Sequence, residues 1–221
     1  LRIFFLFQEF GFNHELVLYS LRTVLSEWPY YYVPSSPAGE SLLLTGCVQP
    51  LSYQGEAARH LPKFQQLQPV GDIDINGQTI RLFNNHLQTT EVSRNKRKLE
   101  KELRADDTDR AERAALTLAD GLHENFKKRA AQAEHINQLI SASPYPTLVC
   151  GDFNSLPSSY VYQTVKGEKL NDGFQTCGHG YMYTFRYFKH LLRIDYILHS
   201  SEFQGVDYFS PDWSIVIIIR W

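Results

Sequence analysis

The sequence predicts an α/β fold in which polar side chains gather where buried strands end. Short apolar runs, such as Leu148–Cys150, are typical of buried strands. The highly charged segment 92–140, which lies between two such runs, carries leucines four residues apart and is typical of helix. The chain has 221 residues, enough for a large core in one domain or two small ones.

The run Gly151-Asp152-Phe153-Asn154 directly follows the most strongly predicted strand. We expect Gly151 to end that strand, and Asp152 and Asn154 to leave extended backbone on the same side. A carboxylate and a carboxamide at the end of a buried strand form a usual polar site of an open α/β sheet. The alternative interpretation is an Asx turn that caps the next helix.

Glu9 follows an apolar, aromatic run at residues 1–7 that reads as a buried strand and is too short to span a membrane. An unpaired carboxylate is costly to bury. We therefore expect Glu9 at the end of the strand, facing a cation or a cleft, although a solvated position just past the strand is the alternative.

His86 is placed by a predicted hairpin. Residues 72–75 alternate polar and apolar side chains, Asn76-Gly77 is a strong two-residue turn signal, and residues 79–83 form the return strand. A lone histidine after a strand is more often structural than catalytic. His86, however, ends a strand in the same manner as Glu9 and Asp152.

The remaining elements are predicted from periodicity and turn residues. We expect two helices within 92–140, the second starting near Asp109. Residues 42–45 read as a strand, and residues 46–69 as a loop with one or two short strands. Further along come a helix at 160–165, a turn at 170–174 and strands at 192–198 and 215–219. The strand at 192–198 carries Arg193 and Asp195 on one face, and Asp195 needs a partner: a metal, a histidine or Arg193.

Composition limits the classes of partner. The net charge of −2 provides no global attraction to nucleic acid or anionic membranes, so any polyanion site must be local. The three cysteines, Cys47, Cys150 and Cys177, lack metal-site spacing and are expected as free thiols. The chain shows no signal peptide or transmembrane run and reads as a soluble domain of unknown location. It opens without a methionine, which leaves an upstream targeting segment or membrane tether open.

The polar residues at strand ends share one kind of chemistry. Carboxylates, a carboxamide and an imidazole form an oxygen-rich site for a hard cation, with a proton-transfer group nearby. That combination suits Mg²⁺-assisted attack of water on a phosphate ester, whereas the spacing that zinc sites require is absent. The set comprises Glu9, His86, Asp152, Asn154 and Asp195, with Asp212 as a further candidate.

Four motifs occur in the order found in the endonuclease/exonuclease/phosphatase superfamily, which the chain therefore resembles. They are Gln8-Glu9, Asn85-His86-Leu87, Gly151-Asp152-Phe153-Asn154 and Arg193-Ile194-Asp195-Tyr196. The resemblance runs from Leu1 to Asp212. It implies a DNase I-like, four-layer α/β sandwich with two mixed sheets face to face and helices outside, formed by a single domain over 1–221 that lacks the usual first strand.

The resemblance also implies the roles of the site residues. Glu9 would be the main metal ligand, with Asp152 and Asp212 as further ligands of Mg²⁺, or alternatively Mn²⁺. Asp152 would also position or deprotonate the attacking water, and Asn154 would hold the phosphate. His86 would hydrogen-bond the phosphate or help to protonate the leaving group.

Two further aspartates have implied roles near the C-terminus. Asp195 would orient a catalytic histidine, and Asp172 matches a mainly structural aspartate. The family usually ends in Ser-Asp-His before its last strand, but here the corresponding place reads Pro211-Asp212-Trp213. One hypothesis is that the natural protein carries Ser-Asp-His between about Trp213 and Ile215.

Two functions of different classes follow. The first is a Mg²⁺-dependent phosphoesterase, a nuclease or a phosphatase, that acts as a monomer on a nucleic acid, an inositol phosphate or a phospholipid headgroup. The second is a catalytically impaired domain that binds phosphorylated ligands. The missing histidine, and the missing asparagine that usually ends the family's first strand, favour the second. The first is favoured by the retained Glu9, His86, Asp152, Asn154 and Asp195.

Overall fold

The protein is described by a computed structural model. It describes residues 5–11, 31–32, 40–45, 53–54, 59–60, 67–68, 70–75, 77–90, 108–185, 191–209 and 216–220. Side chains are described within 70–73, 77–90, 116–117, 119–185 and 191–209.

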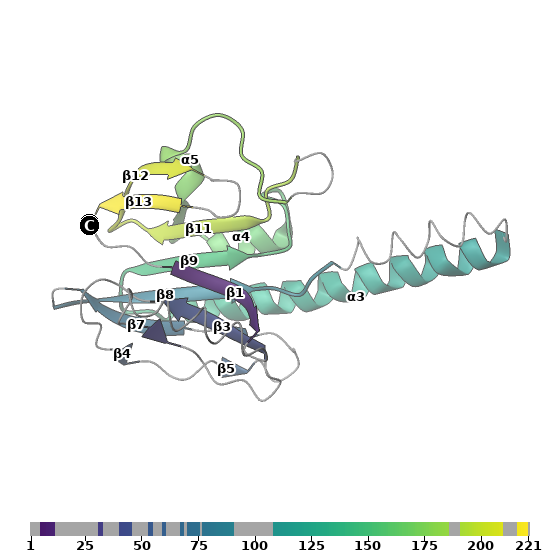
Figure 1. The fold of residues 1–221 in the computed structure, drawn as a ribbon, viewed down its shortest axis with the longest axis horizontal. Coiled ribbons are helices and arrows are strands. Elements are labelled where there is room, and N and C mark those ends of the chain that lie inside the picture. Colours follow the sequence, from purple (N-terminus) through teal and green to yellow (C-terminus); the bar gives the residue numbers. More distant parts are fainter. Residues whose placement is uncertain are drawn as a thin grey trace.

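A six-stranded mixed sheet forms the centre of the fold, with strand order β10-β11-β9-β8-β7-β4 (Figure 1). β8 and β9 are parallel, and the other neighbours pair antiparallel. The predicted hairpin is confirmed as β7 and β8, joined at Gly77, whose φ of +82° suits the Asn-Gly turn. The strands are β4 (Tyr53–Gln54), β7 (Val70–Ile75), β8 (Gln78–His86), β9 (Thr147–Asp152), β10 (Leu170–Asp172) and β11 (Asp195–Ser200).

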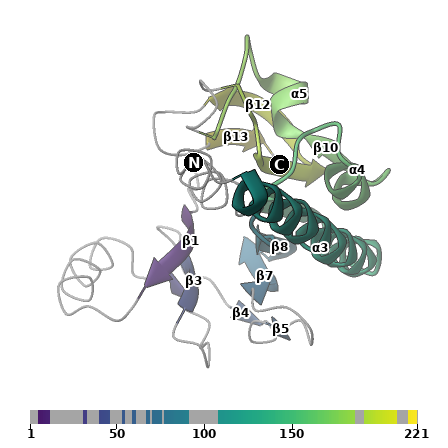
Figure 2. The ribbon, with the colours of Figure 1, turned by 90° about the vertical axis from the view of Figure 1, so that its right-hand side faces the viewer.

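Among the described residues there are three smaller sheets. They are β1-β3-β2 (Phe5–Gly11, Glu40–Thr45, Tyr31–Tyr32), β12-β13 (Gln204–Phe209, Val216–Arg220) and β5-β6 (Arg59–His60, Leu67–Gln68). β1 contacts β8, and in Figure 2 β1 and β3 lie on one side of β8 while α3 lies on the other. The mixed α/β class is confirmed, and the four-layer arrangement stays a prediction.

The helices are α3 (Thr108–Ser141), α4 (Tyr160–Lys166) and α5 (Gly173–Cys177). α3 has 34 residues and is therefore about 50 Å long. Its N-terminal part projects beyond the sheets, whereas its C-terminal part lies along the central sheet beside α4 (Figures 1 and 2). The predicted helix start near Asp109 is confirmed to within one residue, and residues 92–107 lie outside the described residues.

Both faces of the central sheet are buried. On one face, Phe83, Val149 and Leu198 stand at matching register positions and join a core with residues of α3 and α4. On the other face, Leu82 and Leu148 pair at the next position and are also buried. Because side chains alternate along a strand, the register assigns every residue of β8, β9 and β11 to one of these two faces.

Several predicted boundaries differ from the structure. The strand predicted at 1–7 runs from Phe5 to Gly11, so Glu9 lies within β1, at an irregularity in its pairing with β3. Gly151 does not end its strand: with a φ of +146° it still pairs within β9. The turn predicted at 170–174 is the short strand β10 followed by α5, and the strand predicted at 192–198 begins only at Asp195.

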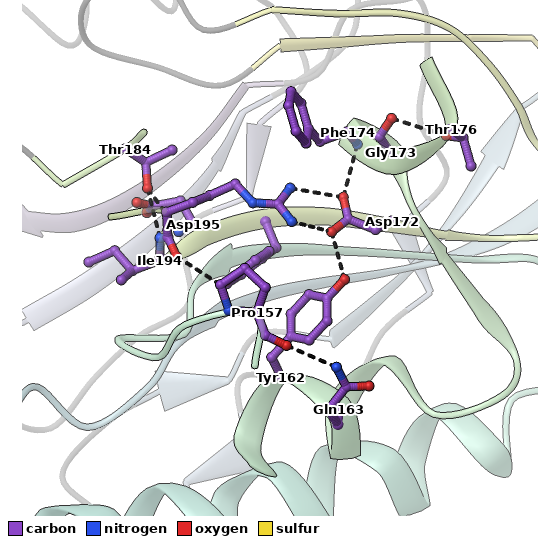
Figure 3. Close-up of polar contacts among 12 residues, drawn as sticks. Pro157, Tyr162, Gln163, Asp172, Gly173, Phe174, Thr176, Thr184, Ile194 and Asp195 are labelled. Atoms are coloured by element: carbon purple, nitrogen blue, oxygen red, sulfur yellow. Dashed lines mark hydrogen bonds and ion pairs between the residues drawn. The ribbon is translucent and has the colours of Figure 1, made fainter. Parts of the chain in front are cut away.

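A buried ion pair ties β10 to the segment before β11 (Figure 3). The Arg193 guanidinium donates to both carboxylate oxygens of Asp172, at 3.1 and 2.6 Å. The Tyr162 hydroxyl and the Phe174 backbone N–H donate to the same carboxylate at 2.7 and 2.9 Å. Arg193 also packs against the rings of Phe174 and Tyr196. This geometry supports the structural role predicted for Asp172.

We predict that Asp172→Ala destabilises the fold by about 3–5 kcal/mol, because Arg193 would remain buried without its partner. The matched control is Lys127→Ala, which removes the ion pair with Glu124 on the surface of α3, where both side chains are 60% exposed. That change should leave stability close to that of the wild type, because solvent screens an ion pair between two exposed side chains. Urea unfolding measures both, and equal effects would contradict the structural role.

Candidate active site

Three candidate residues stand side by side across neighbouring strands. His86, the last residue of β8, pairs with Asp152, the last residue of β9, and Asp152 pairs with Asp195, the first residue of β11. Residues at one register position direct their side chains to the same face, and neighbouring strands lie about 4.8 Å apart. Each of the three lies three positions along its strand from a residue that packs in the α3 and α4 core: Phe83, Val149 or Leu198. Because side chains alternate between the two faces of a strand, the three site residues lie on the face opposite that core.

Asn154 joins this row through a tight turn. Its backbone N–H donates to Asp152 Oδ1 at 2.6 Å, and its side-chain amide donates to the Leu87 carbonyl at 3.1 Å. Asn154 has a φ of +47°, a left-handed conformation that asparagine tolerates well. The expectation of extended backbone from Asp152 to Asn154 is therefore wrong. The Asx turn is present, but Ser159 caps the next helix.

The backbone extends this arrangement past the end of the sheet. The Leu87 N–H donates to the Asp152 carbonyl, and the Phe153 N–H donates to the Ile194 carbonyl, both at 2.9 Å. These bonds continue the pairing of the three strands by one residue. The turn that carries Asp152 and Asn154 is thus fixed from both neighbouring strands.

Asp195 lies in a partly buried position beside Thr184 (Figure 3). Burial raises the pKa of the Asp195 carboxyl to about 6, and a hydrogen bond with the Thr184 side chain opposes this rise. The Thr184 hydroxyl oxygen also accepts the backbone N–H groups of Ile194 and Asp195. Arg193, the partner considered from the sequence, is bound to Asp172 instead. Asp195 is therefore a partly buried carboxylate without that cation.

Two predicted metal ligands remain predictions. Glu9 lies in β1, which contacts β8, but its side chain is not among those described. Asp212 and the segment from Trp213 to Ile215 lie outside the described residues. The hypothesis of a Ser-Asp-His segment there therefore stays a prediction. Cys150 and Cys177 are free thiols, as predicted, and Cys47 is outside the described residues.

The donor groups present suit a hard cation. The described part of the site contributes the Asp152 and Asp195 carboxylates and the Asn154 carboxamide, all oxygen donors. Burial raises the pKa of Asp195, which means that its charged form lacks compensation and would gain from a nearby cation. Within the described ranges, no group of three or more His, Cys, Asp or Glu residues is arranged to hold a metal ion.

Sequence reasoning missed Arg129 and Gln132, two buried polar residues of α3 near this site. Arg129 Nη1 donates to the Gln88 carbonyl at 2.9 Å, and the Gln132 side-chain oxygen accepts the Gln88 N–H at 3.0 Å. Both residues lie just before Ala133 and Ile136, which face the core. Their three-residue spacing on the core side of a charged helix was the available signal.

The sequence profile described as the Endonuclease/Exonuclease/phosphatase family matches residues 5–216. The chain belongs to this family. The resemblance inferred from the four motifs is therefore confirmed, as is the prediction of an enzyme that acts on phosphate ester bonds. Enzymes of the family generally use divalent metal ions.

Solved structures share the fold at low sequence identity. Truncated TDP2 from Caenorhabditis elegans is 13% identical with a TM-score of 0.61, and the match covers 92% of this chain and 74% of that one. The 3′ phosphatase NExo from Neisseria, bound to a product DNA hairpin, is 14% identical with a TM-score of 0.59, covering 100% and 89%. A mannosyl-6-phosphatase from Bacteroides thetaiotaomicron is 15% identical with a TM-score of 0.54, covering 87% and 70%.

Two further searches gave negative results. No curated protein matches the sequence. Within the described residues, no helix combines the length and the apolar character that crossing a bilayer requires. The fold-level likeness to DNase I-like enzymes confirms the predicted fold class.

We predict that Asp195→Asn stabilises the metal-free protein at neutral pH by up to about 3 kcal/mol. The pKa of Asp195 is raised from 3.8 to about 6 on folding, so the folded state binds its proton more tightly than the unfolded state. The stability contributed by the protonated carboxyl is complete below about pH 4 and is lost as the pH rises through about 6.

The difference in unfolding free energy between variant and wild type should therefore be near zero below pH 4 and largest above pH 6. Urea unfolding in EDTA from pH 4 to 8 measures it. A constant difference over this range, or a less stable variant at pH 7, would contradict the raised pKa of Asp195.

Proposed function

We propose that this chain is a Mg²⁺-dependent phosphoesterase that hydrolyses a phosphodiester or phosphomonoester bond through attack of water. The observation that supports this proposal best is the register of three strands, which sets His86, Asp152 and Asp195 side by side. Asn154 is bonded to Asp152 and to the strand end that carries His86. An imidazole, two carboxylates and a carboxamide thus converge at one edge of the sheet.

Each of these groups has a role consistent with its position. Asp152, held by the Asx turn, would orient the attacking water and accept its proton. Asn154 would donate to a phosphate oxygen, and His86 would hydrogen-bond the phosphate or assist protonation of the leaving group. Asp195 would orient an imidazole from the C-terminal region. A divalent cation, when bound by Glu9 and Asp152, would neutralise the charge of the phosphate.

The substrate is a phosphate ester, and nucleic acid is the first class to test. Two of the similar structures hold DNA products: a TDP2 from D. rerio with a single-stranded DNA product, and the Neisseria 3′ phosphatase with a DNA hairpin. The similar Bacteroides structure is named a mannosyl-6-phosphatase, so small phosphomonoesters are the second class to test. The net charge of −2 disfavours binding to long nucleic acid by charge alone, so DNA or RNA ends fit better than extended duplex.

A hydrolysis panel tests the proposal. The substrates are 3′- and 5′-modified oligonucleotides, abasic and intact DNA, RNA, inositol phosphates, sugar phosphates and sphingomyelin. Each is incubated with Mg²⁺, with Mn²⁺ and with EDTA. Hydrolysis that requires the cation supports the proposal. Tight binding of a phosphorylated compound without hydrolysis in any condition would favour the ligand-binding alternative.

We predict that Asp152→Asn abolishes hydrolysis while leaving the fold intact. The amide retains an oxygen that can accept the Asn154 N–H, so the Asx turn survives, but it can neither carry charge nor accept a proton from water. We expect kcat to fall by at least about 1000-fold. Asp152→Ala should be equally inactive.

The two variants separate chemistry from structure. Because strand-end residues contribute little to the core, Asp152→Asn should melt within about 3 °C of wild type. Asp152→Ala also loses the turn acceptor and should melt slightly lower. Activity retained in the asparagine variant would rule out the catalytic role of Asp152.

We predict that Glu9→Gln raises the Mg²⁺ concentration needed for half-maximal activity by at least about tenfold, because a charged ligand becomes neutral. Glu9 lies where the pairing of β1 with β3 is irregular. Such irregularities often redirect a side chain next to an active site, which supports the role of Glu9 as a metal ligand. Glu124→Gln, which neutralises an exposed carboxylate on α3, is the control. An unchanged Mg²⁺ dependence in Glu9→Gln would exclude Glu9 as a ligand.

A further inference from the structure

Arg129 is the largest of the fully buried side chains that the structure describes. Among the described residues, its guanidinium makes one hydrogen bond, from Nη1 to the Gln88 carbonyl at 2.9 Å, and packs over the Phe126 ring. Across the described residues, no acceptor is found for Nε or Nη2. Arg129 is thus a buried cation with two donor groups, Nε and Nη2, that lack an acceptor among the described residues. Arg193, in contrast, is paired with the carboxylate of Asp172.

Such a residue destabilises the fold unless something offsets its burial. Burial lowers the pKa of Arg129 to about 10, and the attraction of the Asp152 carboxylate opposes this effect. An apolar side chain of similar volume at a buried charged position is often neutral or stabilising. The presence of arginine on the core side of α3 therefore calls for a reason other than packing, and its hydrogen bond to Gln88 places it beside the residue, Leu87, that binds the Asp152 carbonyl.

Contacts also link Arg129 to the catalytic turn through the backbone. Together with Gln132, it holds both the carbonyl and the N–H of Gln88. The preceding residue, Leu87, binds the Asp152 carbonyl through its N–H and the Asn154 side chain through its carbonyl. A path of hydrogen bonds thus runs from α3, by way of the segment after β8, to the Asx turn.

We propose that Arg129 is a positioning residue whose buried charge holds the Asp152 carboxylate in its catalytic orientation, beyond the support that its hydrogen bond gives to Gln88. As a statement about catalysis, this rests on the phosphoesterase proposed above. Arg129 is fully buried, so it acts through Asp152 and does not touch the substrate.

Three variants separate the charge of Arg129 from its hydrogen bond. Arg129→Met removes both, Arg129→Lys keeps the charge, and Gln132→Met removes the other hydrogen bond to Gln88 without changing charge. Groups that act through a functional residue typically contribute about 10–100-fold to activity. We expect Arg129→Met to lose about that factor in kcat, with KM changed less than about threefold. Arg129→Lys should recover most of this loss, and Gln132→Met should lose less than about threefold.

A measurement that needs no substrate tests the same proposal. The Asn154 N–H donates to Asp152 Oδ1, so its exchange with deuterium reports how firmly that carboxylate is held. The Phe174 N–H donates to Asp172 Oδ1 in an equivalent turn away from Arg129 and serves as the internal control. In metal-free protein, exchange at Asn154 should rise by about tenfold or more in Arg129→Met, and exchange at Phe174 should not.

The outcomes are distinguishable. Faster exchange at Asn154 alone, restored by lysine, supports the positioning role even if the hydrolysis panel finds no substrate. Equal effects of Arg129→Met and Gln132→Met on exchange and kcat would overturn the role of charge and leave only support of Gln88. Equal acceleration at Asn154 and Phe174, or loss of folding in both Arg129 variants, would overturn the proposal in favour of a purely structural arginine.

Discussion

The candidate site depends on the parallel pairing of β8 with β9. Parallel strands end at the same edge of a sheet, so the last residues of both strands, His86 and Asp152, become neighbours. Antiparallel β11 begins at that edge and adds Asp195. A shift of one residue in either pairing would turn its side chain towards the helix face, where apolar packing sets the register. The core therefore fixes the geometry of the polar row.

The same pairing explains the long connection between β8 and β9. A parallel neighbour requires a crossover, and α3 lies within it, against the face that carries Phe83 and Val149. The helix that closes the crossover also brings Arg129 and Gln132 to the segment after β8. A connection needed for topology thus also supports the residues around the site.

Local sequence signals predicted the parts of the site but not their partners. Apolar runs that end in polar residues identified His86 and Asp152, because both the run and its end are local properties. The partner of Arg193 was not accessible in this way: Asp172 lies 21 residues away, on a strand of three residues too short to show a period. The continuation of β9 through Gly151 was missed for a related reason. Glycine usually weakens a strand, and only the pairing with Asn85 and Tyr196 keeps it in the sheet.

The described charges that are buried or partly buried fall into two groups, which differ in how fully they are compensated. Asp172 receives four hydrogen bonds, from Arg193, Tyr162 and Phe174, and its partner Arg193 is enclosed by aromatic rings. Asp195 and Arg129 lack such sets, and burial shifts the pKa of each towards its neutral form. Both incompletely compensated groups act on the neighbourhood of Asp152, one from β11 and one from α3. The Asp172–Arg193 pair shows that this fold can compensate a buried charge fully, so the incomplete compensation of Asp195 and Arg129 calls for an explanation. We therefore infer that the charge left uncompensated around Asp152 is retained for the cation and the phosphate that the proposed reaction would bring there.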